Sequence, residues 1–221
     1  SITFIAISVW LLATNQPSLI ATILILMICV WAIRLGTFLY IRIRKQTKDS
    51  RFDEMREDFF KFLKFWILQG VSVWIIMMPV ILFFQNSSTT PIQSSLFFVT
   101  IGFIIWLIGL LIESFADYQK YVFKRKPENK ERWIATGLWK KTRHPNYFGE
   151  ITLWIGVYIF ASPFLTDEQS AVALISPLFI FILLKYISGV PLLEKSADTK
   201  WGQNPEYATY KSKSGIIMPK L

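Results

Sequence analysis

The stretch Leu96–Phe115, LFFVTIGFIIWLIGLLIESF, is a continuous apolar run whose one charged residue, Glu113, stands near its end. A bilayer core is crossed by about 20 apolar residues in a helix, so this run has the length of a membrane span. Similar runs are Ile2–Ala13, which is too short to span comfortably, Leu19–Tyr40, Phe62–Phe84, Phe148–Leu165 and Ala171–Leu192. The sequence therefore predicts an all-α, polytopic transmembrane helix bundle with six hydrophobic segments, in a single domain over residues 1–221.

The basic residues alternate with the predicted spans. The chain has a net charge of +9 and 24 Lys and Arg residues, which concentrate in 42–64, 120–143 and 195–220. The alternate connections, 14–18, 85–95 and 166–170, contain no Lys or Arg. This distribution follows the positive-inside rule, so we expect a multi-pass integral membrane protein whose basic loops and C-terminus are cytoplasmic. We expect the positive charge to orient the protein in the membrane and to attract anionic membrane lipids. Nucleic acid is not an expected partner.

Cysteine and histidine are too few for disulfide or zinc chemistry. Cys29 is the single cysteine and His144 the single histidine. An internal disulfide is therefore excluded, and no zinc-like set of ligands exists. We predict no metal site, and Cys29 is expected to pack as a small apolar side chain.

Several polar side chains fall inside or beside the apolar segments, where an ionisable group costs about 2.5–3.5 kcal/mol on insertion scales. Glu113 and Asp117 share one helical face, and Asn146, Glu150 and Trp154 repeat that spacing on the next span. Arg34 and Lys185 are either functional or members of interhelical ion pairs. The full set is Arg34, Gln69, Glu113, Asp117, Asn146, Glu150 and Lys185.

The motif Thr136–Glu150, TGLWKKTRHPNYFGE, stands where an apolar segment begins. Pro145 is suited to the first turn of a helix, because its missing N–H is not needed there. The free backbone N–H groups of the following residues, with Arg143 and His144, form a predicted seat for an anionic cofactor. His144 could instead serve as a helix cap.

On these residues the chain resembles the membrane proteins grouped with the steroid 5α-reductases, in particular their bacterial relatives. The resemblance runs over most of the chain from Trp31. It is carried by the stretches 31–36, 69–70, 113–117, 136–139, 143–150, 188–195 and 204–207. It implies a helix bundle that holds NADPH in a cavity covered by cytoplasmic loops and the tail. It also implies hydride transfer to a conjugated C=C bond in a lipophilic, steroid- or isoprenoid-like substrate. Such relatives usually have a further apolar segment upstream, and the chain opens with Ser rather than Met.

The resemblance implies roles for individual residues around NADPH. Asp117 matches an aspartate that contacts the nucleotide, and Lys124 stands where a basic residue binds phosphate. Asn146 and Glu150 match residues beside the cofactor. The full set of implied cofactor-binding residues is Glu113, Asp117, Lys124, Arg143, His144, Asn146, Glu150, Trp154, Tyr207 and Lys211.

The chain departs from the steroid reductases at the groups that polarise the substrate carbonyl and donate a proton. Those enzymes use a Tyr and a Glu from their N-terminal half. Here no Glu precedes Glu54, and Tyr40 is at the membrane edge. Glu150, Tyr147 and Arg34 are the catalytic candidates, with Glu150 orienting the nicotinamide and Tyr147, Tyr40 or Arg34 acting through water as proton donor.

Two alternatives remain open. Arg-His-Pro-x-Tyr-x-Gly also occurs in membrane methyltransferases of the isoprenylcysteine carboxyl type, which bind S-adenosylmethionine. Those enzymes carry an Arg and a paired Glu-Glu near the last span, whereas this chain has Leu193-Glu194 there, and Glu150 favours the reductases. The other alternative is a non-enzymatic membrane subunit or lipid-binding protein on the same fold.

Overall fold

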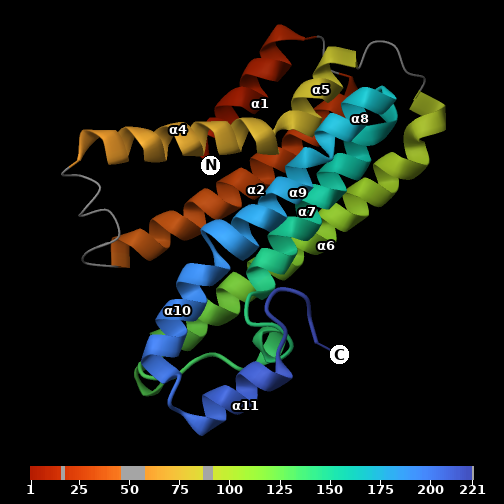
Figure 1. The fold of residues 1–221 in the computed structure, drawn as a ribbon. Coiled ribbons are helices and arrows are strands. Elements are labelled where there is room, and N and C mark those ends of the chain that lie inside the picture. The colour runs from red at the N-terminus through yellow and green to blue at the C-terminus, as the bar shows by residue number, and fades with distance from the viewer. Residues whose placement is uncertain (16–17, 46–57, 87–91, 221) are drawn as a thin grey trace. The chain divides into compact units, whose positions relative to one another are not determined.

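The computed structural model describes residues 1–15, 18–45, 58–86 and 92–220 (Figure 1). The regular structure of these residues is helical, apart from one isolated parallel bridge between Thr142 and Gly215. The all-α prediction is confirmed. The chain divides into unit 1, Ser1–Phe98 with Phe160–Ser176, and unit 2, Val99–Ile159 with Pro177–Leu221. Each unit is described by itself.

Unit 1 is built from apolar helices that pack through aromatic side chains. Phe4 meets Trp31 edge-on at 5.0 Å between ring centroids, and Phe83 meets Phe164 at 4.9 Å. The Ser176 hydroxyl donates to the carbonyl of Ile76 at 2.7 Å. The helices of this unit are α1 (Ile2–Thr14), α2 (Leu19–Lys45), α4 (Phe59–Ile76), α5 (Met78–Asn86), the 3₁₀ turn η4 (Ser162–Phe164) and α8 (Asp167–Ala173).

The predicted segment Phe62–Phe84 is not one helix. It is divided at Met77 into α4 and α5, and Pro79 is the second residue of α5. A proline lacks the N–H that would continue the helix, and its ring crowds the preceding turn. The mixed acidic and basic residues of the loop 41–61 predict a short amphipathic surface helix, and this loop lies largely outside the described residues. At its edges, α2 continues to Lys45 and Asp58 caps α4 by accepting from the N–H groups of Phe60 and Lys61.

Unit 2 carries the motif residues. Its helices are the larger part of α6 (Ile92–Arg125), the short turns η2 (Pro127–Asn129) and η3 (Gly137–Lys140), α7 (Pro145–Ala161), the end of α9 (Ile175–Ile182), the π-helical turn η5 (Leu183–Ile187), α10 (Val190–Trp201) and α11 (Pro205–Lys213). The start of α7 at Pro145 confirms the predicted helix start, and after the last apolar helix the tail continues as α11.

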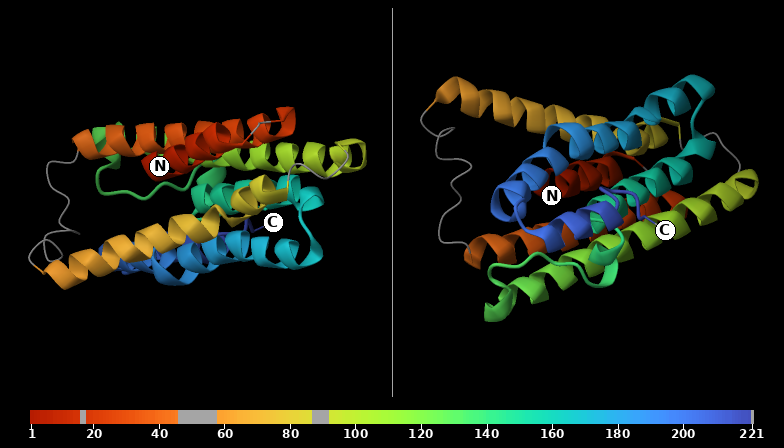
Figure 2. Two further views of the ribbon diagram at one scale, coloured as in Figure 1. Left: turned by 90° about the horizontal axis from the view of Figure 1, so that it is seen from above. Right: turned by 60° about the horizontal axis from the view of Figure 1, so that its bottom comes forward.

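Helices α6 and α7 run antiparallel and touch backbone to backbone (Figure 2). A Cβ atom added at Gly149 would lie 2.5 Å from the backbone nitrogen of Glu113, and one at Gly156 would lie 2.4 Å from that of Trp106. Small residues permit this close approach in membrane bundles, where the lipid leaves packing as the main attraction between helices. The two predicted polar stripes, Glu113 with Asp117 on α6 and Asn146, Glu150 and Trp154 on α7, therefore lie on directly adjoining helices.

The described residues include four helices long and apolar enough to cross a membrane, as a multi-pass membrane protein requires. They cover Leu19–Arg44, Phe59–Ile76, Leu96–Arg125 and Asp167–Trp201. Of the other predicted segments, Ile2–Ala13 forms the 13-residue α1, and Phe148–Leu165 corresponds to the 17-residue α7. The number six and the cytoplasmic orientation stay predictions.

Candidate functional site

The first part of the motif attaches its loop to α6. Gly137 has a φ of +59°, in the left-handed region that favours glycine. The next two residues then reach α6: the N–H of Leu138 donates to the Gln119 side chain at 3.1 Å, and the Trp139 indole donates to the carbonyl of Ala116 at 3.0 Å. The Nζ atom of Lys120 lies 4.5 Å from the centre of the Trp139 ring. The turn thus positions the basic residues that follow it.

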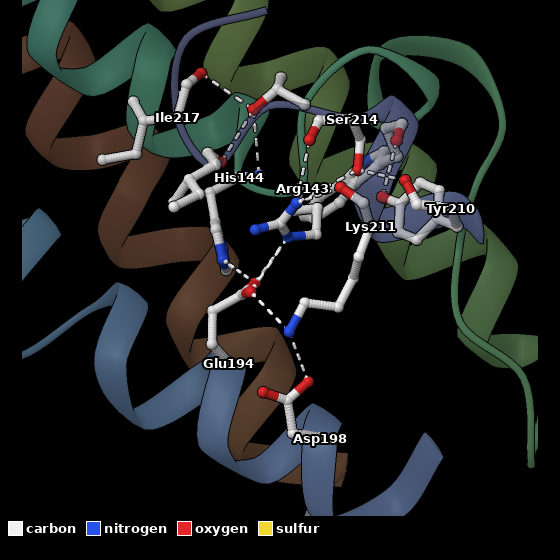
Figure 3. A network of polar contacts seen from close by, with 11 residues as sticks. Arg143, His144, Glu194, Asp198, Tyr210, Lys211, Ser214 and Ile217 are labelled. Carbon is white, nitrogen blue, oxygen red and sulfur yellow. Dashed lines mark hydrogen bonds and ion pairs between the residues drawn. The ribbon is translucent and has the colours of Figure 1, made fainter. Parts of the chain in front are cut away.

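Arg143 joins the loop before α7 to the C-terminal part of the chain (Figure 3). Its Nε donates to both carboxylate oxygens of Glu194, at 3.1 and 3.0 Å. Its Nη1 donates to the carbonyls of Lys211 and Ser214, at 3.1 and 3.0 Å. The Arg143 side chain is 9% exposed. The predicted phosphate ligand is therefore engaged in a buried ion pair, and its binding to a cofactor stays a prediction.

Glu194 is the centre of this network, and sequence reasoning did not identify it. Besides Arg143 it contacts Nε2 of His144 at 3.0 Å and Nζ of Lys211 at 3.7 Å (Figure 3). Lys211 also reaches Asp198 at 2.7 Å. One carboxylate on α10 therefore links the motif loop to α11. In the sequence, Glu194 is only an acidic residue directly after an apolar segment. Its three basic partners, Arg143, His144 and Lys211, were each noted there separately.

His144 is buried and has asymmetric surroundings. It is 4% exposed, its Nε2 faces Glu194, and its Nδ1 has no hydrogen-bond partner among the described residues. The ring of Tyr147 stacks on it at 5.4 Å between centroids. Burial, the largest influence, lowers the pKa of His144 below 6.5, while the hydrogen bond and charge of Glu194 act in the opposite direction. Lys120 and Arg143 add to the lowering.

This arrangement predicts a pH dependence that can be measured directly. Because the chain has a single histidine, an NMR titration of labelled His144 should give a pKa below 6.5, and Glu194→Gln should lower it further. An unfolded histidine with its pKa near 6.5 takes up the proton first. The contribution of His144 to stability is therefore complete above pH 6.5 and is lost as the pH falls from 6.5 toward the folded-state pKa. A folded-state pKa above 6.5 would contradict the assignment.

A cavity of about 190 Å³ lies in unit 2 between α6, the loop after it, α10 and α11. Its basic lining residues are Lys120, Lys124, Arg132, Arg143, Lys200 and, when protonated, His144, and Glu194 is its one carboxylate. Its aromatic lining residues are Phe123, Trp133, Trp139, Trp201, Tyr207 and Tyr210. Among them, Trp133 and Tyr207 lie 5.1 Å apart and Trp201 and Tyr207 lie 5.8 Å apart, centroid to centroid.

The two tyrosines on α11 are neutral members of this wall. Burial raises the pKa of Tyr210 to about 12, and its hydroxyl donates to the carbonyl of Trp139 at 2.7 Å. Burial also raises the pKa of Tyr207 to about 12, with the charges of Glu194 and Asp198 adding to the effect. Neither phenol ionises near neutral pH, so both serve as apolar surface with a polar edge.

The structure places the predicted cofactor residues in two groups. Lys124, Arg143, His144 and Tyr207 line the cavity, and Lys211 belongs to the network beside it. The second group lies along the α6–α7 contact and does not line this cavity: Glu113 (2% exposed), Asp117 (6%), Asn146, Glu150 and Trp154. Tyr147 connects the two groups, because its ring stacks on His144 of the first group and it directly follows Asn146 of the second in the sequence.

Arg34 is on α2 in unit 1, where its guanidinium lies 5.9 Å from the centre of the Phe38 ring. Its predicted catalytic role stays a prediction. Sequence reasoning missed further cavity residues, namely Lys120, Arg132, Trp133, Lys200, Trp201 and Tyr210. Tryptophans spread along a membrane protein are usually interface or packing residues, and a single sequence does not show that Trp133 and Trp201 meet at 6.0 Å.

Comparisons with known proteins give one curated relative and one family. The relative is a probable O-methyltransferase, ustE, of Ustilaginoidea virens, which is 39% identical over 57 residues. That match covers 26% of this chain and 20% of the relative, so the chain spans a small part of that protein. No solved structure matches the chain. The family described as "Protein of unknown function (DUF1295)" matches residues 1–214, and the chain therefore belongs to this family of membrane proteins related to the steroid 5α-reductases.

Proposed function

We propose that the chain is a membrane-embedded, NADPH-dependent reductase of a conjugated C=C bond in a lipophilic, steroid- or isoprenoid-like substrate. The observation that supports it best is the charge balance of the cavity in unit 2. Five Lys and Arg residues line it against one carboxylate, Glu194, so positive charge exceeds negative even though Arg143 pairs with Glu194 and Lys200 with Glu131. A cofactor with several phosphate groups suits such a lining, because charge-assisted contacts to phosphate are strong and specific.

The aromatic wall suits the base of a nucleotide. Trp133, Trp201 and Tyr207 form a contiguous aromatic surface, with Lys200 5.2 Å from the centre of the Trp201 ring. Stacking of a base on an aromatic side chain contributes about 1–3 kcal/mol. Phosphates on the lysines and arginine, with adenine on the rings, account for both kinds of lining residue at once.

In this proposal the cavity takes up one end of the cofactor, and its size supports that division. About 190 Å³ is smaller than the 300–1,000 Å³ typical of ligand pockets, so it holds the adenosine phosphate end and not a whole dinucleotide. The other end extends toward α7, where Asn146 and Glu150 follow His144. The Oδ1 atom of Asn146 is buried and has no hydrogen-bond partner among the described residues. A carbonyl acceptor of this kind fits the carboxamide of the nicotinamide ring.

In this proposal the protein binds and orients, and NADPH supplies the hydride when it is bound. Asn146 holds the carboxamide, and Glu150 on the same helix face fixes the ring next to the substrate. The buried contact between α6 and α7 keeps water away from the reacting carbon atoms. In unit 2 the proton donor is Tyr147, acting through water. Arg34 and Tyr40 belong to unit 1, and their part in the reaction stays a prediction.

Binding of NADPH to detergent-purified protein tests the cofactor assignment. We expect Arg132→Gln and Lys200→Gln to weaken NADPH binding by about tenfold to a hundredfold each, since a hydrogen bond to a charged group contributes about 1.5–3 kcal/mol. Isothermal titration with NADPH, NADH and S-adenosylmethionine measures the effect. Lys213→Gln is the matched control, because Lys213 is exposed and does not line the cavity. Equal NADPH affinity in all three variants would refute the assignment of phosphate to this cavity.

A second candidate is S-adenosylmethionine-dependent methyl transfer, and the relative named as a probable O-methyltransferase favours it. Against it stands the charge of the cavity, because S-adenosylmethionine has a sulfonium cation and no phosphate. The same titration separates the two, with oxidation of NADPH in the presence of enones, sterols and polyprenyl lipids as the activity test. Glu150→Gln is the activity control. Tight NADPH binding without turnover of any such lipid would favour the non-enzymatic alternative.

A further inference from the structure

The C-terminal strap, residues 214–220, is attached to the loop that enters α7. The N–H of Arg143 donates to the carbonyl of Gly215 at 2.9 Å, and the N–H groups of Gly215 and Lys220 both donate to the carbonyl of Lys141, at 3.0 and 2.9 Å. The Thr142 hydroxyl lies 2.9 Å from the carbonyl oxygens of both Ile216 and Ile217. These bonds hold the strap within a few residues of Pro145, where α7 begins.

The contact between α6 and α7 gives the depth of the strap relative to the apolar layer. Gly149 lies against the backbone of Glu113, and the helices are antiparallel, so Pro145 is level with about residue 117 of α6. The apolar run of α6 ends at Phe115. The exposed aromatic side chains Phe115 and Tyr118 lie at this level, as in the aromatic belts of membrane interfaces. The strap is therefore at the border between the apolar layer and water.

Of three successive apolar side chains in the strap, the middle one is buried and the two on either side are exposed. Ile217 is 3% exposed, whereas Ile216 is 42% and Met218 is 58% exposed. The exposed lysines Lys141, Lys213 and Lys220 flank the pair. Apolar side chains beside lysines at this depth complement the two parts of an anionic lipid, its acyl chains and its phosphate.

We propose that the C-terminal strap is a membrane-interface anchor that binds anionic lipids. Ile216 and Met218 insert among the outer acyl segments, and Lys141, Lys213 and Lys220 bind the lipid phosphates. Since Arg143 also donates to the carbonyl of Ser214, at the start of the strap, a docked strap supports the wall of the cavity from the lipid side. The anchor does not depend on which cofactor the cavity binds.

A lipid-depth measurement on the whole chain tests this. Met218→Cys is labelled with an environment-sensitive fluorophore in a Cys29→Ala background, and the protein is placed in nanodiscs of phosphatidylcholine with or without phosphatidylglycerol. Ile216→Cys is the second reporter, and Ser212→Cys, exposed on α11 outside the strap, is the control. With phosphatidylglycerol present we expect blue-shifted emission and quenching by acyl-chain nitroxides at 216 and 218, and neither at 212. Lys213→Gln with Lys220→Gln should reduce that quenching.

Two results would overturn the proposal. The first is water-like, unquenched emission at both 216 and 218, equal to that at 212, in discs with phosphatidylglycerol. The second is equal quenching in neutral and anionic discs, which would remove the role of the lysines. Because no cofactor is added, these outcomes are independent of the NADPH titration.

Discussion

Replacing Glu194 with alanine is expected to lower the free energy of unfolding by about 3–5 kcal/mol. Removing one partner of a buried ion pair leaves the other charge without compensation, and this is more costly than the pair itself is stabilising. The change would leave Arg143, whose side chain is 9% exposed, without its carboxylate partner. It would also remove Oε1, which His144 contacts, and Oε2, which Lys211 contacts. Unfolding by denaturant in detergent micelles, followed by tryptophan fluorescence, measures the loss.

A matched control comes from the same network. Asp198 is the other partner of Lys211, but its side chain is 47% exposed, so Asp198→Ala should cost at most about 1 kcal/mol. The double variant Arg143→Ala with Glu194→Ala should lose less than the sum of the two single variants, because each removes the same pair. Strict additivity of the two, or a Glu194→Ala variant as stable as Asp198→Ala, would show that the network is not a stabilising unit.

The fold was predictable where its cause is local. Long apolar runs predicted the helices of α2 and α6, and Pro145 predicted the first residue of α7. The division of Phe62–Phe84 was foreseeable from Pro79, whose backbone restriction is local too. The end of α7 was less accessible, because Phe164 and Leu165 prolong the apolar run beyond Ala161, whereas α1 ends one residue after the predicted run Ile2–Ala13.

The site was predictable only in part, because its residues meet across long stretches of sequence. The motif indicated Arg143 and His144, and both line the cavity. Their partner Glu194 is about 50 residues away, and no periodicity connects the two positions. The same is true of Trp133 and Tyr207, which meet at 5.1 Å. Helical spacing placed Glu113 and Asp117 on one face of α6. That α7 packs against this part of α6 is known only from the close backbone contact between Gly149 and Glu113 in the structure.

Gly156→Ala is expected to destabilise the protein by about 3 kcal/mol, at the upper end of the range for overpacking. The added Cβ atom would lie 2.4 Å from the nitrogen of Trp106 and 2.7 Å from the carbonyl oxygen of Gly102. Both neighbours are backbone atoms, so no side chain can rotate away and the two helices must separate. Gly149→Ala should act similarly, because its Cβ would lie 2.5 Å from the nitrogen of Glu113.

Gly70→Ala is the control for a glycine-to-alanine change inside an apolar helix. A Cβ atom at Gly70 in α4 meets nothing within 4 Å, so the variant should be neutral or gain up to about 1 kcal/mol from helix propensity. Unfolding in detergent micelles compares the three variants under one condition. Since separation of α6 from α7 would also move Glu113 away from the helix that carries Asn146 and Glu150, Gly149→Ala should weaken NADPH binding as well. If Gly149→Ala and Gly156→Ala were as stable as Gly70→Ala, the close α6–α7 contact could not be what fixes the two polar stripes together.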